Sequence, residues 1–378
     1  MKKILILSFS VIRSDPRVMR QIRLLENDGR YKVSVAGFGQ SPEANIEFFE
    51  LFRPSSTFLD KVFWSVKLLV GAFASYGNSL AYVQQCRDIF SKIQFDLVIA
   101  NDISSLPLGI ALAKGSPVLL DAHEYSPREF DDRLLWRISF GRYYHYVCTK
   151  YLSSVSSMVT VCQGIADEYL RVYGVKAGVV YNAPEDQLLT PIVSKDETIR
   201  LIHHGAAIRS RHLEVMIEMM SYLDDRFVLD FMLVETDPKY MSQLRALCEG
   251  SEKIKFIRPV ATHEICQRLN HYDLGVYLLP PVNFNHEHAL PNKFFEFIQA
   301  RLALAIGPSP EMSKLLKLYG CGVVADSFEP KSLARAIEKI SREDIFVYKQ
   351  AAHRAAADLN YNVGGRLLVS EIERVTSI

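Results

Sequence analysis

The 378-residue sequence lacks several features that would exclude or define whole classes of protein. Its six cysteines are scattered and form no Cys-x-x-Cys pair, which argues against structural zinc and indicates a reducing compartment. No stretch of about 18 uncharged apolar residues occurs, so no transmembrane helix is expected. The apolar run after Met1-Lys2-Lys3 is too short for a signal peptide and fits a first β-strand instead.

An excess of charge of one sign is also absent, because 44 basic and 43 acidic side chains leave a formal net charge of +1. This balance argues against a general nucleic-acid-binding protein. The histidines include one tight group, His286-Glu287-His288, in a loop rich in proline and asparagine. We interpret this group as polar loop residues and predict no metal site.

Short apolar runs alternate with helix-like segments along the whole chain. Strands are predicted at 3–8, 31–38, 45–52, 95–100, 117–120, 157–161 and 178–181, and again at 199–203, 227–234, 254–257, 273–279, 302–306 and 321–326. This alternation is typical of an α/β protein with doubly wound parallel sheets. A polar stretch over 184–197 resembles a linker, so we predict one Rossmann-like domain over 1–185 and a second over 186–359.

Two segments are unusually rich in apolar and aromatic side chains. Residues 57–86 are predicted to form a long helix that packs in the core, or an amphipathic segment that lies on a membrane surface through 57–77. In residues 128–151, basic and aromatic side chains alternate at roughly helical spacing. That pattern fits core or interface packing, the headgroup layer of an anionic membrane, or nucleic acid. Glu129, Asp131 and Asp132 weigh against nucleic acid.

Polar residues stand at the ends of two predicted strands in the first half of the chain. The strand at 95–100 ends in Asn101-Asp102, and the strand at 117–120 ends in Asp121-Ala122-His123-Glu124. Open α/β sheets bind their ligands at the carboxyl ends of parallel strands. A single histidine there is more often structural, but the Asn-Asp at the other strand end favours a binding site.

Residues 290–301 read Leu-Pro-Asn-Lys-Phe-Phe-Glu-Phe-Ile-Gln-Ala-Arg and are followed by an apolar run and then Gly-Pro-Ser-Pro-Glu. Helical spacing places Asn292, Glu296 and Gln299 along one polar side, with Lys293 at its margin. Pattern alone indicates an amphipathic helix with a solvated face. The segment closely resembles the signature of retaining glycosyltransferase family 4, in which a Pro-x-Lys-x-(Phe/Leu)-Glu-(Phe/Tyr) helix precedes an apolar strand and a Pro-Glu turn.

This resemblance implies a GT-B architecture, in which two Rossmann-like domains face a central cleft and a final helix, here 360–378, crosses back to the first domain. In the family, the glutamate of the signature helix holds the ribose of a nucleotide-sugar and the lysine neutralises the diphosphate. Those roles fall on Glu296 and Lys293, with Asn292 beside them. The Asp-x-His-Glu sequence resembles the family's acceptor-domain motif, whose histidine faces the transferred sugar. The acceptor-side residues are therefore Asp102, Asp121, His123 and Glu124.

A glycine loop in the second half resembles the family's other donor-binding element. Family members carry a glycine, then an arginine, then a lysine or arginine five residues beyond, all facing the diphosphate. Aligned on Gly205, the first basic position is Ala206 and the second is Arg211, and we expect Arg209 to substitute for the missing cation. The family's second glutamate, eight positions before the first, is His288 here, which would offer a polar group to a sugar hydroxyl.

The resemblance implies a retaining glycosyltransferase that moves a sugar from a nucleotide-diphosphate-sugar to a saccharide or lipid-linked saccharide in cell-surface polysaccharide synthesis. The expected donor is a UDP- or GDP-sugar, with no metal and no cofactor, and the catalytic residues are His123, Arg211, Lys293 and Glu296. The alternatives are a nucleotide-sugar 2-epimerase of the same fold and a non-catalytic nucleotide-sugar-binding subunit. The partners are the donor, the acceptor and a membrane surface, with no nucleic acid. The predicted location is the cytoplasm or the inner face of the membrane.

Overall fold

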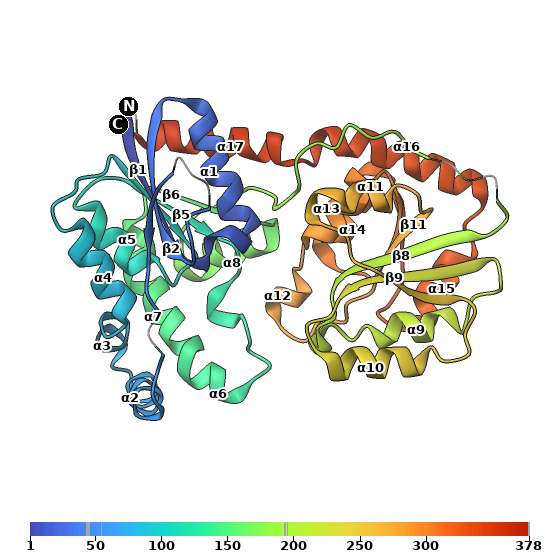
Figure 1. The fold of residues 1–378 in the computed structure, drawn as a ribbon, viewed down its shortest axis with the longest axis horizontal. Coiled ribbons are helices and arrows are strands. Elements are labelled where there is room, and N and C mark those ends of the chain that lie inside the picture. Colours follow the sequence, from blue (N-terminus) through green and yellow to red (C-terminus); the bar gives the residue numbers. More distant parts are fainter. Residues whose placement is uncertain (43–45, 54, 193, 195, 377–378) are drawn as a thin grey trace. The chain divides into compact units, whose positions relative to one another are not determined.

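The computed structural model describes residues 1–42, 46–53, 55–192, 194 and 196–376. The chain divides into two compact units, each built on its own sheet (Figure 1). The first unit comprises Met1–Val180, Asn283–Asn285 and Gly365–Ile378, and the second comprises Tyr181–Val282 and His286–Gly364.

The first unit has a parallel sheet in the order β3-β2-β1-β4-β5-β6-β7. Its strands are β1 (Lys2–Val11), β2 (Tyr31–Phe38), β3 (Glu47–Glu50), β4 (Leu97–Asn101), β5 (Val118–Ala122), β6 (Ser157–Thr160) and β7 (Gly178–Val179). Its helices are α1 (Pro16–Asp28), α2 (Phe58–Leu69), α3 (Phe73–Asn78), α4 (Ala81–Phe90), α5 (Leu106–Ala113), α6 (Leu134–Trp136), α7 (Arg142–Tyr151) and α8 (Gln163–Tyr173). The strand order reverses between β1 and β4, which is where open α/β sheets bind ligands.

The second unit has a parallel sheet in the order β10-β9-β8-β11-β12-β13, which reverses between β8 and β11. Its strands are β8 (Ile199–Ala206), β9 (Phe227–Val234), β10 (Ile254–Ile257), β11 (Leu274–Tyr277), β12 (Ala303–Ile306) and β13 (Gly322–Val324). Its helices are α9 (Glu214–Met220), α10 (Pro238–Leu247), α11 (Ile265–Leu269), α12 (Phe284–Glu287), α13 (Asn292–Gln299), α14 (Pro310–Tyr319), α15 (Pro330–Glu338) and α16 (Arg342–Asp358). The predicted α/β class with two doubly wound parallel sheets is confirmed.

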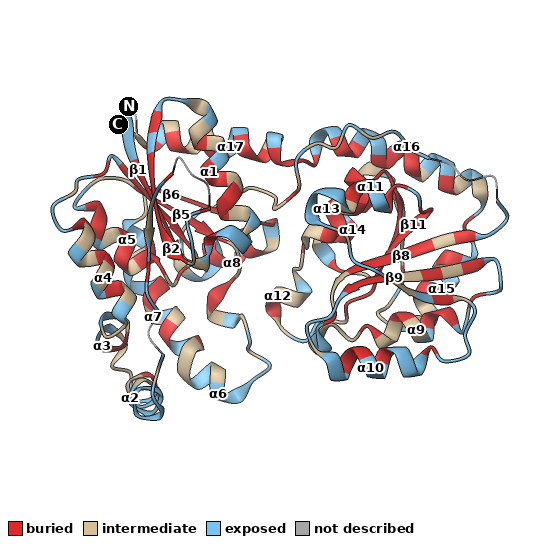
Figure 2. Cartoon of the chain, viewed as in Figure 1, coloured by how far each residue is buried: buried red, intermediate tan, exposed pale blue. Residues whose placement is uncertain are grey.

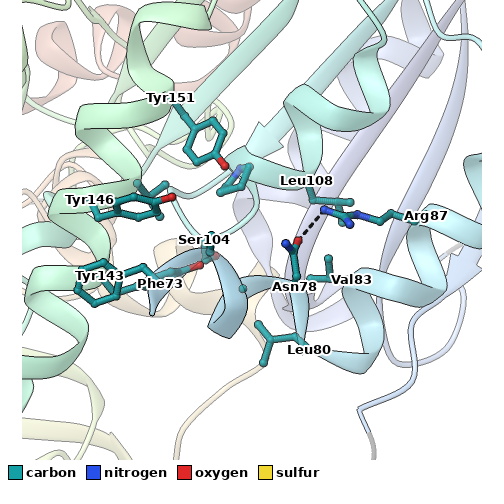
Figure 3. Close-up of a pocket in the computed structure, with 14 residues that line it drawn as sticks. Phe73, Asn78, Leu80, Val83, Arg87, Ser104, Leu108, Tyr143, Tyr146 and Tyr151 are labelled. Atoms are coloured by element: carbon teal, nitrogen blue, oxygen red, sulfur yellow. Dashed lines mark hydrogen bonds between the residues drawn. The ribbon is translucent and has the colours of Figure 1, made fainter. Parts of the chain in front are cut away.

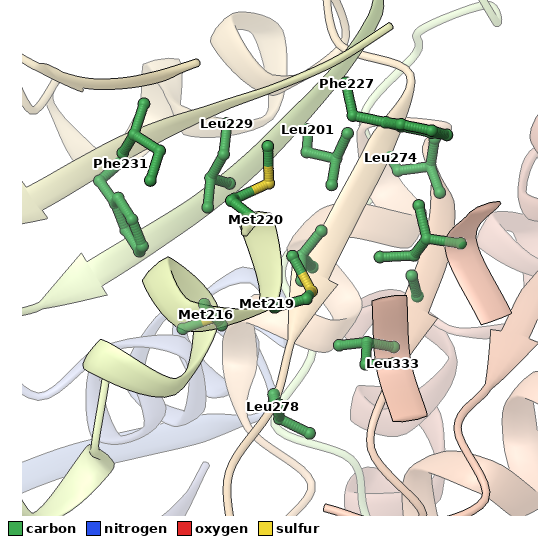
Figure 4. Close-up of a cluster of buried hydrophobic side chains, with 14 of the residues drawn as sticks. Leu201, Met216, Met219, Met220, Phe227, Leu229, Phe231, Leu274, Leu278 and Leu333 are labelled. Atoms are coloured by element: carbon green, nitrogen blue, oxygen red, sulfur yellow. The ribbon is translucent and has the colours of Figure 1, made fainter. Parts of the chain in front are cut away.

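Each sheet carries its own apolar core. In the second unit, methionines of α9 pack against aliphatic and aromatic side chains of β8, β9 and β11 (Figure 4). In the first unit, the core on β1, β2 and β4 includes Leu368, Ile372 and Val375 of the last helix, α17 (Tyr361–Thr376). The apolar face of α17 is thus buried against the first sheet, far from it in sequence.

The packing of α13 on the second sheet depends on a glycine in β11. A Cβ built on Gly275 would lie 2.4 Å from the ring of Phe297, so only a glycine lets the helix approach this closely. Phe294, Phe295 and Ile298 are also buried. The helix is therefore held on most of its circumference, and the prediction of a broad solvated face is wrong.

The segment 57–86 is not a long core helix. It forms α2, α3 and the first part of α4, and within α2 the structure buries Leu68 while most of its other side chains are exposed. The apolar composition thus indicated helical structure, but the single long helix is wrong, and the core-packing alternative did not reveal that most apolar residues of α2 face solvent. Over the described residues, the structure holds no helix long and apolar enough to cross a membrane.

In the segment 128–151, residues 134–151 form one continuous helix that contains a π-helical turn. A single turn, α6, runs into a π-helical turn at Arg137–Gly141 and then into α7. Tyr143, Val147 and Cys148 of α7 are buried, so this part packs as core, whereas the α6 turn is largely exposed. The group around His286 is likewise not a plain loop, because α12 covers Phe284–Glu287.

Candidate functional site

The donor-side residues of the second unit gather where β8 ends, beside the reversal of strand order. β8 closes with His203-His204-Gly205-Ala206. Lys293 and Glu296 lie one turn apart on α13, which starts after Pro291 in extended conformation. The close packing of α13 brings both side chains to the end of this strand.

Lys293 is buried, with 6% of its surface exposed. Its Nζ lies 3.4 Å from Nε2 of His203 and 5.1 Å from the ring centre of Tyr277. Nδ1–H of His203 donates to the carbonyl of Val276 at 2.8 Å, so Nε2 is left to accept from the lysine. Burial and the charge of Arg211 lower the pKa of Lys293 to about 7, while Glu296 opposes this change.

Gly205 leaves the space in which Lys293 and Arg211 meet. Its φ of +122° is a conformation that side-chain-bearing residues rarely adopt. A Cβ at this position would lie 3.0 Å from Nζ of Lys293 and 3.8 Å from Nη1 of Arg211. The side chains of Lys293 and Arg211 thus both lie next to Gly205, which has no side chain of its own. The space left there by the missing side chain, beside two basic groups, suits a small polyanion.

Glu296 supplies the carboxylate of this cluster. Its Oε2 lies 3.4 Å from Nε2 of His204, and its side chain is 14% exposed. Burial and Lys293 lower the pKa of His204 to about 3, so this imidazole is neutral at physiological pH. Glu296 thus lies beside a neutral imidazole, and a carboxylate at this position is able to accept from vicinal hydroxyls.

The other donor-side predictions fall in different surroundings. Arg209 does not join Arg211, because its Nη1 donates to Gln243 of α10 at 2.8 Å and its guanidinium lies over Tyr240. His288 has its Nδ1 3.5 Å from Oε1 of Glu311. Asn292 is the partly exposed first residue of α13.

Gln299 does not lie on the polar side of α13, contrary to the helical projection. It is fully buried, and its Nε2 donates to the carbonyls of Ala356 at 2.8 Å and Leu359 at 3.1 Å. Its Oε1 accepts from the backbone N–H of Gln187 at 3.0 Å. Gln299 thus joins α13 to the end of α16 and to the chain that enters the second unit.

The acceptor-side residues of the first unit gather around a cation that the sequence did not single out. Arg17, in the first turn of α1, donates to both carboxylate oxygens of Asp102 at 3.2 and 2.9 Å. Its Nη1 also lies 3.8 Å from Oδ1 of Asp121. Burial opposes the charge of Arg17, yet Asp102 and Asp121 raise its pKa above the ordinary value. Its position is fixed by Asp15, which caps α1 by accepting from Val18 N–H.

The carboxylates and the histidine of this cluster respond differently to burial. Burial raises the pKa of Asp121 to about 6, although Arg17 opposes this. Arg17 holds the pKa of Asp102 below its usual value despite burial. Burial and Arg17 lower the pKa of His123 to about 4, so its imidazole is neutral near pH 7. Burial also raises the pKa of Glu124. The cluster therefore offers a neutral imidazole next to carboxylates that are already paired.

Arg17, Gln21, His203 and His204 belong to these clusters but were not predicted. Gln21 Nε2 donates to Asp121, and its Oε1 accepts from Asn101 at 3.1 Å. The available signals were an arginine directly after a capping Asp-Pro, and two adjacent histidines at the end of an apolar strand. Among the residues that the structure describes, no three His, Cys, Asp or Glu side chains gather to hold a metal ion.

Comparison with known proteins agrees with the fold of both units. A model of Glycosyltransferase Family 4 matches residues 18–185. No curated protein matches the chain in sequence. Among solved structures, sucrose-phosphate synthase from Thermosynechococcus elongatus superposes with a TM-score of 0.76 at 12% identity over 100% of both chains.

Two further structures carry a nucleotide. HepE from Anabaena, in complex with UDP and glucose, gives a TM-score of 0.71 at 14% identity over 99% of this chain and 100% of its own. A variant of S. aureus TarM, in complex with Fondaparinux, alpha-GlcNAc-glycerol and UDP, gives 0.71 at 8% identity over 100% of both chains. The chain thus has the GT-B fold, and its residues 18–185 match the model of Glycosyltransferase Family 4.

Proposed function

We propose that the protein is a retaining glycosyltransferase that moves a sugar from a nucleotide-diphosphate-sugar to a saccharide or lipid-linked saccharide. Its family supports sugar transfer in general. The donor assignment is carried by one observation: Lys293 and Arg211 meet at Gly205, at the carboxyl end of β8, with Glu296 on the same helix. Two cations with one carboxylate leave an excess of positive charge, which favours the binding of an anion such as a nucleoside diphosphate.

The nucleotide is proposed to be uridine or guanosine diphosphate, with Glu296 on the ribose hydroxyls. Solved complexes of HepE with UDP and with UDP-glucose support the uridine choice, although that protein is only 13–14% identical to this chain. His288 stands where the family's second glutamate is expected and is proposed to contact the sugar. Asn292 would bind beside it at the helix start.

Transfer then proceeds with retention at the anomeric carbon. The bond from this carbon to the β-phosphate oxygen breaks, and the acceptor hydroxyl attacks on the face that the nucleotide leaves. The acceptor proton goes to the departing phosphate oxygen, which becomes part of the released diphosphate. Lys293 and Arg211 stabilise the charge that develops there, so no metal ion is required.

The cluster of the first unit is proposed to serve the acceptor side. His123 is neutral near pH 7 and so is able to donate or accept a hydrogen bond with a sugar hydroxyl. Arg17 holds Asp102 and Asp121 in place, and Glu124 follows His123 in the chain. The acceptor is proposed to be an intermediate of cell-surface polysaccharide synthesis.

The donor proposal is tested by a thermal-shift panel of UDP-, GDP-, dTDP- and CMP-sugars, with and without a chelator. A stabilisation by a uridine or guanosine donor that survives the chelator is the expected result. A shift that the chelator abolishes would refute the metal-independent part, and the absence of any shift would refute the donor site.

The reaction itself is tested with an isotope-labelled donor and a set of saccharide acceptors. The expected product carries the label in a glycosidic bond whose anomeric configuration, read by NMR, equals that of the donor. An inverted anomer would refute retention. An epimerised sugar or an unchanged donor would instead favour the 2-epimerase or the non-catalytic subunit.

A further inference from the structure

Helix α2 presents apolar side chains to solvent. Phe58 is 79% exposed, Leu59 76%, Phe63 56% and Val66 50%. Figure 2 accordingly draws most of α2 in the colour of exposed residues. A helix of a globular domain normally buries such residues against the core, so this face indicates a binding partner.

A second exposed apolar group directly precedes, in the chain, a turn that packs against α2. On the α6 turn, Leu134 is 61% exposed and Leu135 77%. The π-helical turn that follows packs against α2. Nη1 of Arg142 donates to the carbonyl of Leu69 at 3.2 Å, which ties the start of α7 to the end of α2. We call residues 58–70 together with residues 133–142 the α2–α6 surface.

Basic side chains stand among these apolar ones. In the described part of the chain, Lys61, Arg137 and Arg142 have no carboxylate within ion-pair distance, whereas Arg133 and Arg128 lie beside Asp132 and Asp131. The aliphatic stems of lysine and arginine add to the apolar contact while their heads stay in water. The mixture of exposed aromatic, aliphatic and unpaired basic groups is complementary to the headgroups and acyl boundary of an anionic bilayer.

A neighbouring pocket is too small to take an acyl chain. It lies between α3, α4, α5 and α7, where Tyr143, Tyr146 and Tyr151 approach Leu80 and Leu108 (Figure 3). Its volume is about 50 Å³, which is room for one or two water molecules. A larger hollow of about 580 Å³ lies beside it, and Arg137 and Arg142 contribute to its lining.

We propose that the α2–α6 surface binds the face of an anionic lipid bilayer. Its apolar side chains would enter the boundary between headgroups and acyl chains, and its basic side chains would lie at the lipid phosphates. A second copy of the chain fits less well, because a two-fold contact would place the same unpaired cations opposite one another. The proposal does not depend on the assigned donor site or on sugar transfer.

The test uses flotation of the full-length protein with vesicles of phosphatidylcholine alone and of equal parts phosphatidylcholine and phosphatidylglycerol. Binding to the anionic vesicles only, falling as salt rises from 50 to 500 mM, is expected. The apolar pair Leu59→Ser/Phe63→Ser and the charge pair Lys61→Glu/Arg137→Glu should each lower the bound fraction at least tenfold. Matched controls on the second unit are Leu247→Ser/Leu318→Ser and Lys314→Glu/Lys317→Glu, which should bind as the wild type does.

Circular dichroism and the thermal shift with donor verify that each variant is folded. Failure of the wild type to bind anionic vesicles would overturn the proposal. Wild-type binding by both surface variants would also do so. Light scattering without lipid tests whether the surface binds a second copy of the chain. A dimer that the same variants dissociate would show that it does, and would overturn the lipid proposal.

Discussion

The two polar clusters use their charges in opposite ways. In the first unit, one cation, Arg17, lies between the carboxylates of Asp102 and Asp121, so this cation is paired within the protein. In the second unit, two cations share one carboxylate, and that carboxylate faces a neutral histidine. The first cluster thus has more carboxylates than cations, whereas the second has more cations than carboxylates.

This difference separates a stabilising role from a binding role. A buried ion pair becomes costly when one partner is removed, because the other charge stays buried without compensation. A buried cation that awaits a ligand costs free energy of folding in the free protein, and its removal relieves that cost. Substitutions in the two clusters should therefore have opposite effects on stability and on donor binding.

The largest effect is expected from Lys293→Ala and Glu296→Ala. Each should lower kcat/KM for sugar transfer by about 10³-fold, since each removes a buried group aimed at the donor. The melting temperature of Lys293→Ala should stay level or rise, because a desolvated lysine is gone. Steady-state kinetics and calorimetry check both, with Lys314→Ala as a surface control. Wild-type turnover in either variant would remove that residue from the site.

Arg17→Met should act on stability. It leaves Asp102 and Asp121 without their cation, so the free energy of unfolding should fall by about 3 kcal/mol. Donor affinity, measured by titration calorimetry below the melting transition, should change little. Urea unfolding gives the first quantity, and Arg17→Lys should restore part of it. An unchanged midpoint with tenfold weaker donor binding would assign Arg17 to the donor site instead.

Much of the fold could be predicted from the sequence because its strands are continuous apolar runs between polar turns. β12 is completely buried and was visible as such. The placement of Lys293 and Glu296 was predicted by the signature of α13. Helical periodicity placed Gln299 beside Glu296, yet the structure buries it against α16. A helix that is packed on several sides buries some polar side chains, and these form hydrogen bonds with backbone carbonyls that would otherwise have no partner.

Contacts between residues that lie far apart in the chain could not be predicted from the sequence. Arg17 meets Asp102 and Asp121 through the parallel pairing of β1, β4 and β5, which brings strand ends together irrespective of their distance along the chain. The exposure of Phe58 and Leu59 was left open for a related reason, because the sequence allowed either a core helix or a surface segment. An apolar pattern predicts a buried face but does not reveal whether the partner belongs to the same chain.

Donor binding should weaken as pH rises above neutrality. The pKa of Lys293 is about 7 in the free protein, and a bound diphosphate favours the charged amine and raises it. Below pH 7 the lysine is already charged, so affinity stays constant. Above pH 7 binding must take up a proton, so Kd should rise about tenfold per pH unit until the raised pKa is reached.

Titration calorimetry at pH 6.5, 7.5 and 8.5, in buffers of different ionisation enthalpy, measures both the affinity and the proton uptake. Lys293→Arg is the control, because a guanidinium stays charged over this range and should remove the pH dependence. Equal affinities at the three pH values without proton uptake would show that Lys293 is charged before the donor binds.

The smallest change in donor affinity should come from substitution of Arg209. Its comparison with Arg211 distinguishes the roles of two arginines in the same loop. Arg211 reaches Gly205, whereas Arg209 is engaged with Gln243 and Tyr240 of α10. Arg211→Ala should therefore raise the Kd for the donor about 30-fold, since a charge-assisted contact to phosphate is lost. Arg209→Ala should change Kd less than about twofold, because an exposed contact of this kind contributes little. If the two variants weaken donor binding equally, Arg209 must leave α10 for the diphosphate and supply the cation that Ala206 lacks.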